Sequence, residues 1–208
     1  MASNIFISFR FDDGINYKRK LEELFDDERE LLNRSEKIDR SECSEETIQK
    51  YLYKLIKRTT ITIVILTPNA VEYRKGALGY DDWLYDELSY SLQHREENTT
   101  NGVIALYTRE AKDKLFKTGT HKCNVCNKEQ NINTILHFDN LVRKNMMNIK
   151  GSFKKNPCPG VYDSDYDSYI SLVAFEEFVD NPMYYIDKAL EKRNNKYQYE
   201  LVKRMNNN

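Results

Sequence analysis

The sequence lacks the features that would place it in a membrane or outside the cell. Its longest apolar stretch, Ile61 to Leu66, is far too short to cross a bilayer. The opening residues, MASNIFISFRFDD, have neither the basic start nor the long apolar core of a signal peptide. Only four cysteines occur, at irregular spacing, which argues for reduced thiols rather than a disulfide framework. We therefore expect a cytoplasmic protein with no membrane partner.

An excess of charge of one sign is also missing. The formal net charge is −1 over 208 residues, so the chain carries no global electrostatic footprint for nucleic acid. Hydrophobic residues make up 40% and aromatic residues 12%, which is enough to build a core and excludes wholesale disorder. We expect one domain over residues 1–194, with an insertion at about 109–160 and a C-terminal tail at 195–208.

Short β-branched runs alternate with helical patterns along the chain. Strands are expected at residues 4–8, 60–67, 102–107 and 168–174, and helices are expected after Gly14 and at about 44–58, 81–93 and 182–193. Residues 33–43 are polar and are expected to form a long loop. This alternation predicts an α/β fold with a doubly wound parallel sheet. Ligands of such sheets bind beyond the carboxyl ends of the strands, which here means after Ser8 and Thr67.

The common motifs of doubly wound proteins are absent. No G-x-G-x-x-G follows the first strand, and no Walker sequence occurs, so a dinucleotide-binding domain and a P-loop are disfavoured. Asp12 and Asp13 follow the first strand, as acidic residues do in response-regulator receivers. The strand ending at Leu66-Thr67-Pro68 has no phosphoacceptor aspartate, however, and this excludes the receiver interpretation.

Three motifs together resemble the TIR-like family, in particular the TIR component of the bacterial Thoeris anti-phage defence system. They are Phe6-Ile7-Ser8-Phe9, Thr62-Ile63-Val64-Ile65-Leu66-Thr67 and Trp83-Leu84-Tyr85-Asp86-Glu87. The resemblance covers residues 4–107 and extends to 168–193. It implies a flavodoxin-like parallel sheet and an enzyme that hydrolyses or cyclises NAD, with NAD as substrate and no required cofactor. The glutamate that this chemistry uses in the family corresponds to Glu87.

The resemblance also implies partners. Thoeris members are similar in making a cyclic or modified ADP-ribose second messenger that activates a separate effector protein. A phage-derived activator and self-association of the TIR domains are expected on the same ground. The insertion at 109–160 and the acidic exit at Asp12 and Asp13 depart from many TIR domains, so the resemblance leaves the identity of the product open.

The position of Glu87 on its helix is informative without the resemblance. On a helical wheel with Trp83 at zero, Glu87 falls near ~40°, between Trp83 and Leu84 at ~100°. A carboxylate among packed positions is costly unless something satisfies it, and substrate hydroxyls are one such partner. The alternative is a glutamate at the rim of the packed face that reaches water or pairs with a lysine.

The exit of the first strand supplies candidate ligand contacts. The candidate substrate-binding residues are Ser8, Phe9, Arg10, Phe11, Asp12 and Trp83. Phe9 or Phe11 could stack on a base or on nicotinamide, and Arg10 could hold the pyrophosphate. Ser8 could bond a ribose hydroxyl, and Trp83 lies one turn before Glu87. The alternative is that alternate residues pack under the sheet while the charged ones are solvated.

The insertion contains a possible metal site. His121, Cys123 and Cys126 form H-x-C-x-x-C, and Cys158 and His137 are candidates to complete a tetrahedral set. A single C-x-x-C leaves two interpretations open, a structural zinc and unliganded reduced thiols. A catalytic zinc is not expected, because the predicted pocket lies at the other motifs.

Two further functions remain open on the sequence. One is a non-catalytic TIR-like scaffold that acts by self-association or partner docking. The other is a nucleoside N-glycosidase or deoxyribosyltransferase, a flavodoxin-like class that also uses one glutamate. The spacing of Trp83 and Glu87 favours the TIR interpretation over this second class.

Overall fold

A computed structural model of the chain describes residues 3–27, 31–33, 45–72, 83–94, 96, 98–135, 141–156, 158 and 160–204. The strands are β1 (Ser3–Ser8), β2 (Leu31–Asn33), β3 (Ile61–Leu66), β4 (Gly102–Tyr107), β5 (Phe116–Lys122), β6 (Glu129–Ile135) and β7 (Ser171–Ala174). The helices are α1 (Phe11–Asp27), α2 (Glu45–Ile56), α3 (Pro68–Glu72), α4 (Trp83–Leu92), α5 (Arg109–Leu115), α6 (Leu141–Lys144), α7 (Phe175–Asp180) and α8 (Pro182–Asn194), with a short 3-10 helix η1 (Lys196–Gln198).

A five-stranded parallel sheet forms the centre of the molecule. Its strand order is β2-β1-β3-β4-β7, and every pair of neighbours runs parallel. This order confirms the predicted flavodoxin-like doubly wound α/β fold. The strand that follows β1 in the chain, β2, lies on one side of it, and the next strand, β3, lies on the other side. The topological switch point therefore lies between β1 and β3.

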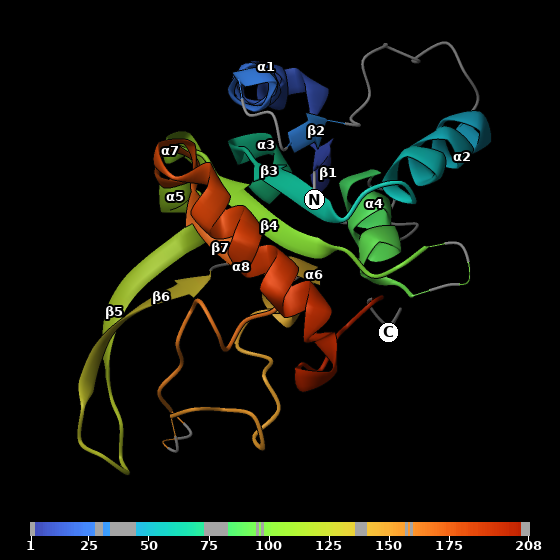
Figure 1. Cartoon of the computed structure of the whole chain (residues 1–208). Coiled ribbons are helices and arrows are strands. Elements are labelled where there is room, and N and C mark those ends of the chain that lie inside the picture. The colour runs from blue at the N-terminus through green and yellow to red at the C-terminus, as the bar shows by residue number, and fades with distance from the viewer. Residues whose placement is uncertain are drawn as a thin grey trace.

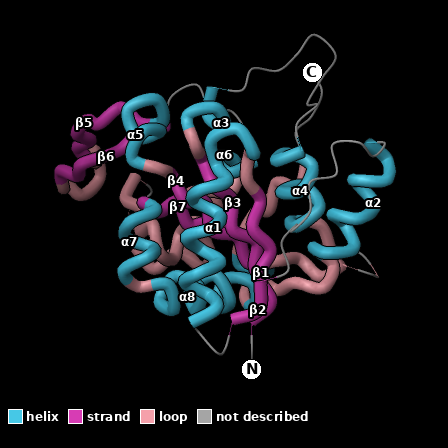
Figure 2. The backbone as a smooth tube through the Cα atoms, turned by 90° about the horizontal axis from the view of Figure 1, so that it is seen from above, coloured by secondary structure: helices cyan, strands magenta, loops and turns pink. Residues whose placement is uncertain are grey.

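Helices cover both faces of the sheet (Figures 1 and 2). On one face, α1, α7 and α8 pack on the isoleucines of β1 and β3. On the other face, α4 and α6 pack on Val64 and Leu66, and α2 packs on Phe6 and Tyr90. Because successive strand residues point to opposite faces, Ile5 and Ile7 lie on the α1 side and Phe6 lies on the α4 side.

The predicted central strand is confirmed. All six residues of β3 are buried, as expected for a β-branched strand covered on both faces. Pro68 ends the strand as predicted, and it also begins α3, because proline is tolerated in the first turn of a helix. The helices α2, α4 and α8 lie where the sequence pattern placed them; Asp81 and Asp82 lie outside the described residues.

The insertion is more regular than the sequence analysis expected. Residues 109–135 form α5 and then an antiparallel hairpin, β5–β6, which extends away from the main sheet (Figure 1). In both overall views the hairpin lies on the opposite side of the molecule from α2 and α4 (Figures 1 and 2). The expected loop at 33–43 begins inside a strand, because Leu31–Asn33 pairs with β1. Residues 34–43 lie outside the described residues.

The chain after α8 packs on the body as far as residue 203. Tyr199 is buried in the core and pairs with Ile149, and the Val202 amide donates to Asn145 Oδ1 at 3.0 Å. The last four residues of the predicted tail, 205–208, lie outside the described residues. None of the helices in the part of the chain that the structure describes has the length and apolarity of a membrane span.

Candidate functional site

Ser8 and Glu87 meet at the carboxyl end of β1. Ser8 is the last residue of that strand and lies opposite Val64 of β3. Strand alternation places its side chain on the same face as Phe6, which is the face that α4 covers. Glu87 lies in the middle of α4, and the Ser8 hydroxyl donates a hydrogen bond to Glu87 Oε2. The two residues are 79 positions apart in sequence and adjoin the switch point of the sheet.

Glu87 is a buried carboxylate, with only 8% of the residue exposed. Its helical neighbours Leu84 and Leu88 are also buried, which confirms the prediction that the glutamate lies within the packed arc of α4. A buried carboxylate needs hydrogen-bond partners to offset its lost hydration, and the Ser8 hydroxyl is one. The side chain is therefore held at the ligand edge of the sheet rather than on a solvated surface.

A chain of buried hydroxyl groups fixes α4 on the sheet one turn beyond Glu87. Thr62 Oγ1 of β3 donates to Ser91 Oγ at 2.8 Å, and Ser91 Oγ donates to the Glu87 carbonyl at 2.8 Å. Thr62 and Ser91 are fully buried. These bonds join the backbone of Glu87 to the central strand and so set the rotation of the helix.

The remaining sides of α4 are also covered, which the helical wheel did not anticipate. The Tyr90 ring stacks on Tyr53 of α2, with ring centroids 3.9 Å apart. Ser89 Oγ donates to the Lys203 carbonyl at 2.8 Å. Only one arc of the helix was expected to pack, but α2 and the C-terminal segment enclose two further sides.

The exit of β1 is shorter than the sequence analysis expected. Helix α1 begins at Phe11, so Phe11 and Asp12 belong to its first turn rather than to a loop. Only Phe9 and Arg10 connect strand and helix. Gly14 lies inside the helix, at a point where a Cβ would be only 3.3 Å from the Phe9 side chain. The small residue permits this tight strand-to-helix connection.

The predicted contacts at this exit differ in exposure. Phe11 is 50% exposed, and its ring centroid lies 5.1 Å from that of the half-buried Phe9. Arg10 is half-buried and Asp12 is exposed. Trp83 is the first residue of α4, within the helix expected at 81–93, but its side chain lies outside the described residues. The structure thus brings Ser8 and Glu87 into contact and pairs Phe9 with Phe11.

Two residues at this edge were not predicted as site residues. Asp13 Oδ1 accepts from Thr67 Oγ1 at 2.6 Å, and Asp13 Oδ2 accepts from the Asn69 amide at 2.9 Å, so α1 is tied to the end of β3. Lys18 is buried, with its Nζ 5.7 Å from the centroid of the Phe9 ring. The sequence shows that Asp13 is an acidic residue near the start of a helix. It does not show that Asp13 contacts Thr67, which is 54 residues away.

The predicted cysteine cluster is present at the tip of the hairpin. The sulfur atoms of Cys123, Cys126 and Cys158 lie within 4.8 Å of one another and could bind a metal. His121 is exposed on β5, and its Nε2 lies beside Gly160. The other candidate ligand, His137, lies outside the described residues.

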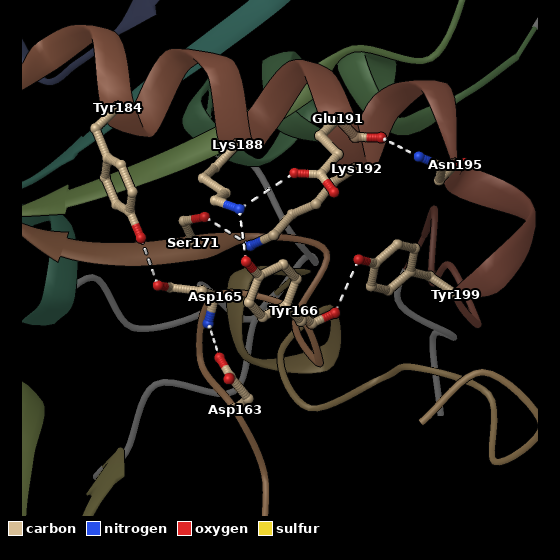
Figure 3. A network of polar contacts seen from close by, with 10 residues as sticks. All are labelled: Asp163, Asp165, Tyr166, Ser171, Tyr184, Lys188, Glu191, Lys192, Asn195 and Tyr199. Atoms are coloured by element: carbon tan, nitrogen blue, oxygen red, sulfur yellow. Dashed lines mark hydrogen bonds and ion pairs between the residues drawn. The ribbon is translucent and has the colours of Figure 1, made fainter. Parts of the chain in front are cut away.

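A second polar cluster joins α8 to the segment before β7 (Figure 3). Lys192 is buried and its Nζ donates to Ser171 Oγ at 2.8 Å. Lys188 Nζ donates to the Tyr166 hydroxyl at 2.9 Å, and Tyr184 donates to Asp165. Burial lowers the pKa of Lys192 to about 8. Lys192 lines a cavity of about 170 Å³, which no motif in the sequence indicated.

With this geometry established, a comparison of the chain with protein-family models finds no match.

Proposed function

We propose that the protein cleaves the bond between nicotinamide and ribose in NAD, with Glu87 as the catalytic carboxylate. The observation that carries this proposal is the contact between Glu87 and Ser8. A buried carboxylate is held by a strand-end hydroxyl beside the switch point of a parallel sheet, where ligands of such folds bind. Buried carboxylates at such positions are candidates for chemistry because their placement is costly to the fold.

A single carboxylate is sufficient for this reaction. Ordinary glycosidases need a second acid to protonate a poor leaving group, whereas nicotinamide leaves NAD as a neutral molecule. The enzyme must orient the ribose and stabilise the positive charge that develops on its ring. Glu87 does both by accepting hydrogen bonds from the ribose hydroxyls and by facing the oxocarbenium ion. The Ser8 hydroxyl keeps the carboxylate in one orientation during this step.

The exit of β1 supplies the substrate contacts in this proposal. Phe11 presents an exposed ring for stacking on the nicotinamide or the adenine, with Phe9 behind it. Arg10 binds the pyrophosphate, and Asp12 bonds a ribose hydroxyl. Trp83, which precedes Glu87 by one turn of α4, remains a predicted substrate contact in this proposal.

The resemblance to TIR proteins of Thoeris systems extends the proposal to the product and its use. The protein would make a cyclic or otherwise modified ADP-ribose that reaches a separate effector protein, in response to a phage-derived activator. Cyclisation requires that a second nucleophile of the same molecule lies closer to the ribose than water does. Self-association and a cytoplasmic location belong to the same proposal.

For the cysteine cluster we propose a structural zinc ion. Three thiolates favour zinc among the common divalent ions. The cluster lies on the opposite side of the molecule from α4, which carries Glu87 (Figures 1 and 2). A role of this zinc ion in stabilising the structure of the insertion is therefore better supported than a role in NAD cleavage.

The experiment that tests the function is a substrate comparison. The purified protein is incubated with NAD and with free nucleosides, alone and with lysate of phage-infected cells, and the products are separated by chromatography. Release of nicotinamide from NAD supports the proposal. Release of bases from nucleosides supports the N-glycosidase instead. No turnover under any condition, with self-association intact, supports the scaffold.

A further inference from the structure

The first strand of the β5–β6 hairpin is largely exposed to solvent. Six of the seven β5 residues are exposed, and because consecutive strand residues point to opposite faces, both faces of this strand are open to solvent. At the base of the hairpin, Phe116 packs edge-on against Tyr107. An isolated two-stranded hairpin is marginally stable in water. Its free end therefore needs a separate attachment.

The turn at the tip of the hairpin directs a backbone amide at the sulfur atom of Cys123. The Cys123 amide donates to the Lys128 carbonyl at 2.9 Å, and the Asn127 amide donates to the Cys123 carbonyl at 2.8 Å. Asn127 has a φ of 56°, a left-handed conformation that reverses the chain directly after Cys126. The Val125 amide lies 3.4 Å from Cys123 Sγ and points at it. Amide groups directed at sulfur stabilise a thiolate ligand.

The third sulfur comes from a different part of the chain. Cys158 Sγ lies 2.7 Å from Cys123 Sγ and 3.4 Å from Cys126 Sγ. Lys154 Nζ donates to the carbonyls of Asn156, Cys158 and Val161, so one ammonium group closes the loop that carries Cys158. Thiolates around a tetrahedral zinc ion lie about 3.8 Å apart, so small displacements of the sulfur atoms would admit the ion.

A candidate fourth ligand, His121, lies beside this cluster. A Cβ built on Gly160 would lie 3.3 Å from His121 Nε2 and 3.7 Å from Cys123 Sγ. The imidazole nitrogen and the sulfur thus border the same small volume, which the absence of a side chain at residue 160 leaves open. His121 is exposed, so its ring is able to turn toward the sulfur atoms.

We propose that His121 completes a Cys₃His zinc site that fastens the tip of the β5–β6 hairpin to the loop carrying Cys158. This inference rests on the zinc proposed above, and it adds the fourth ligand and the mechanical role. Zinc bound to three thiolates and one imidazole has a closed coordination sphere, which is typical of structural sites. Two segments that are 35 residues apart at Cys123 and Cys158 are then joined through one ion.

The ligand set is tested by metal content and by cobalt substitution. The full-length protein, purified under reducing conditions, is expected to hold about one zinc ion per chain. Cys126→Ser should lose this ion, whereas Cys43→Ser, which changes the fourth cysteine of the chain, should retain it. With Co²⁺, His121→Ala should shift the visible bands of the tetrahedral complex and weaken metal binding by at least about a hundredfold. His137→Ala is the matched histidine control and should change neither.

The possible results distinguish the proposed zinc site from the proposal that His121 is its fourth ligand. A protein that binds zinc and keeps its cobalt spectrum in His121→Ala overturns the fourth ligand and leaves the zinc site in place. A reduced protein that binds no zinc overturns both. A stoichiometric disulfide between Cys123 and Cys158 in protein isolated under anaerobic conditions would also overturn both, because those sulfur atoms would then be unable to hold an ion.

The mechanical role is tested by limited proteolysis. Lys117, Lys122 and Lys128 are exposed tryptic sites in the hairpin. Removing zinc with a chelator should accelerate cleavage at these three lysines by about tenfold or more, because the hairpin then opens locally. Cleavage at Lys50, on the exposed face of α2, serves as the internal control and should not change. Equal cleavage rates at the hairpin lysines with and without zinc would contradict the fastening role.

Discussion

Glu87 and Ser8 form a pair in which the hydroxyl positions the carboxylate. Glu87 is buried, and its Oε2 accepts from the strand-end hydroxyl of Ser8. The bond from Ser91 to the Glu87 carbonyl fixes the helix backbone at the same point. Catalysis by one carboxylate depends on such preorganisation, because the group must face the ribose before positive charge develops.

Ser8→Ala tests this positioning. Removing the hydroxyl should lower kcat/KM for NAD by about ten- to a hundredfold, since a hydrogen bond to a charged group contributes about 1.5–3 kcal/mol. Steady-state release of nicotinamide measures the effect. Ser89→Ala removes another buried hydroxyl, the one bonded to the Lys203 carbonyl, and should leave the rate unchanged. Equal losses in both variants would point to a general disturbance of the fold instead.

At the scale of elements, the ends of β1 and β3 are joined through the first turn of α1. Asp13 accepts from the Thr67 hydroxyl and from the Asn69 amide, and so caps α3 while holding α1 against it. The turn that carries Phe11 and Asp12 is therefore fixed relative to the sheet. This contact stabilises the candidate site without taking part in the chemistry.

Asp13→Ala should lower the free energy of unfolding by about 1–3 kcal/mol, because two hydrogen bonds to a carboxylate are lost and a helix end is uncapped. Asp12→Ala is the matched control. It removes an acid from the same first turn of α1, but Asp12 is exposed, so a change within about 0.5 kcal/mol is expected. Urea unfolding followed by circular dichroism compares the two. Equal effects would show that helix charge, and not the tie to β3, matters.

The sequence was informative where burial imposes a pattern and uninformative where it does not. The run at Ile61–Leu66 predicted a central strand because both faces of such a strand are apolar. The hairpin from Phe116 to Ile135 escaped prediction because the residues of β5 after Phe116 are exposed, are polar or glycine, and show no apolar alternation. The strand Leu31–Asn33 is too short to produce a periodic signal. Helical spacing predicted that Glu87 lies among packed positions, and the resemblance to the TIR-like family singled it out as the candidate carboxylate. Its contact with Ser8 could not be predicted, because that contact depends on the packing of α4 on β1.

At the scale of the whole molecule, buried ionisable groups make stability depend on pH. Burial lowers the pKa of Lys192 from 10.5 to about 8, so the unfolded chain holds this proton more tightly than the folded chain does. The resulting penalty is complete below pH 8 and fades as the pH rises toward 10.5. Burial raises the pKa of Tyr199 from 10 to about 12, which favours the folded state below pH 10 and is lost above it. The two effects therefore occupy different pH windows.

The free energy of unfolding should rise by about 2 kcal/mol between pH 8 and pH 10 on account of Lys192. Lys192→Met fills a similar volume without the charge and should abolish this rise. Lys112→Met, which removes an exposed lysine from α5, serves as the control. Urea titrations at several pH values provide the measurement. A Lys192→Met protein whose stability changes from pH 8 to pH 10 by the same amount as that of wild type would refute the assignment.

The arrangement of the molecule also separates the cysteine cluster from the candidate active site. The hairpin and α4 lie on opposite sides in both overall views (Figures 1 and 2). Cys126→Ser should therefore loosen the hairpin and leave the rate of NAD cleavage unchanged within error. Parallel assays of nicotinamide release and tryptic cleavage check this. A loss of turnover that follows metal loss would mean that the two regions are coupled.

The most direct measurement of the central claim compares nicotinamide release from NAD by wild type, Glu87→Gln and Asp86→Asn. Glutamine keeps the shape and the contact with Ser8 but cannot stabilise a cation, so the rate should fall by about a thousandfold with folding intact. Asp86 precedes Glu87 on α4 and accepts from Gln49 at 3.2 Å, so its variant controls for loss of a neighbouring charge and should remain active. A Glu87→Gln protein that releases nicotinamide at the wild-type rate would contradict the account.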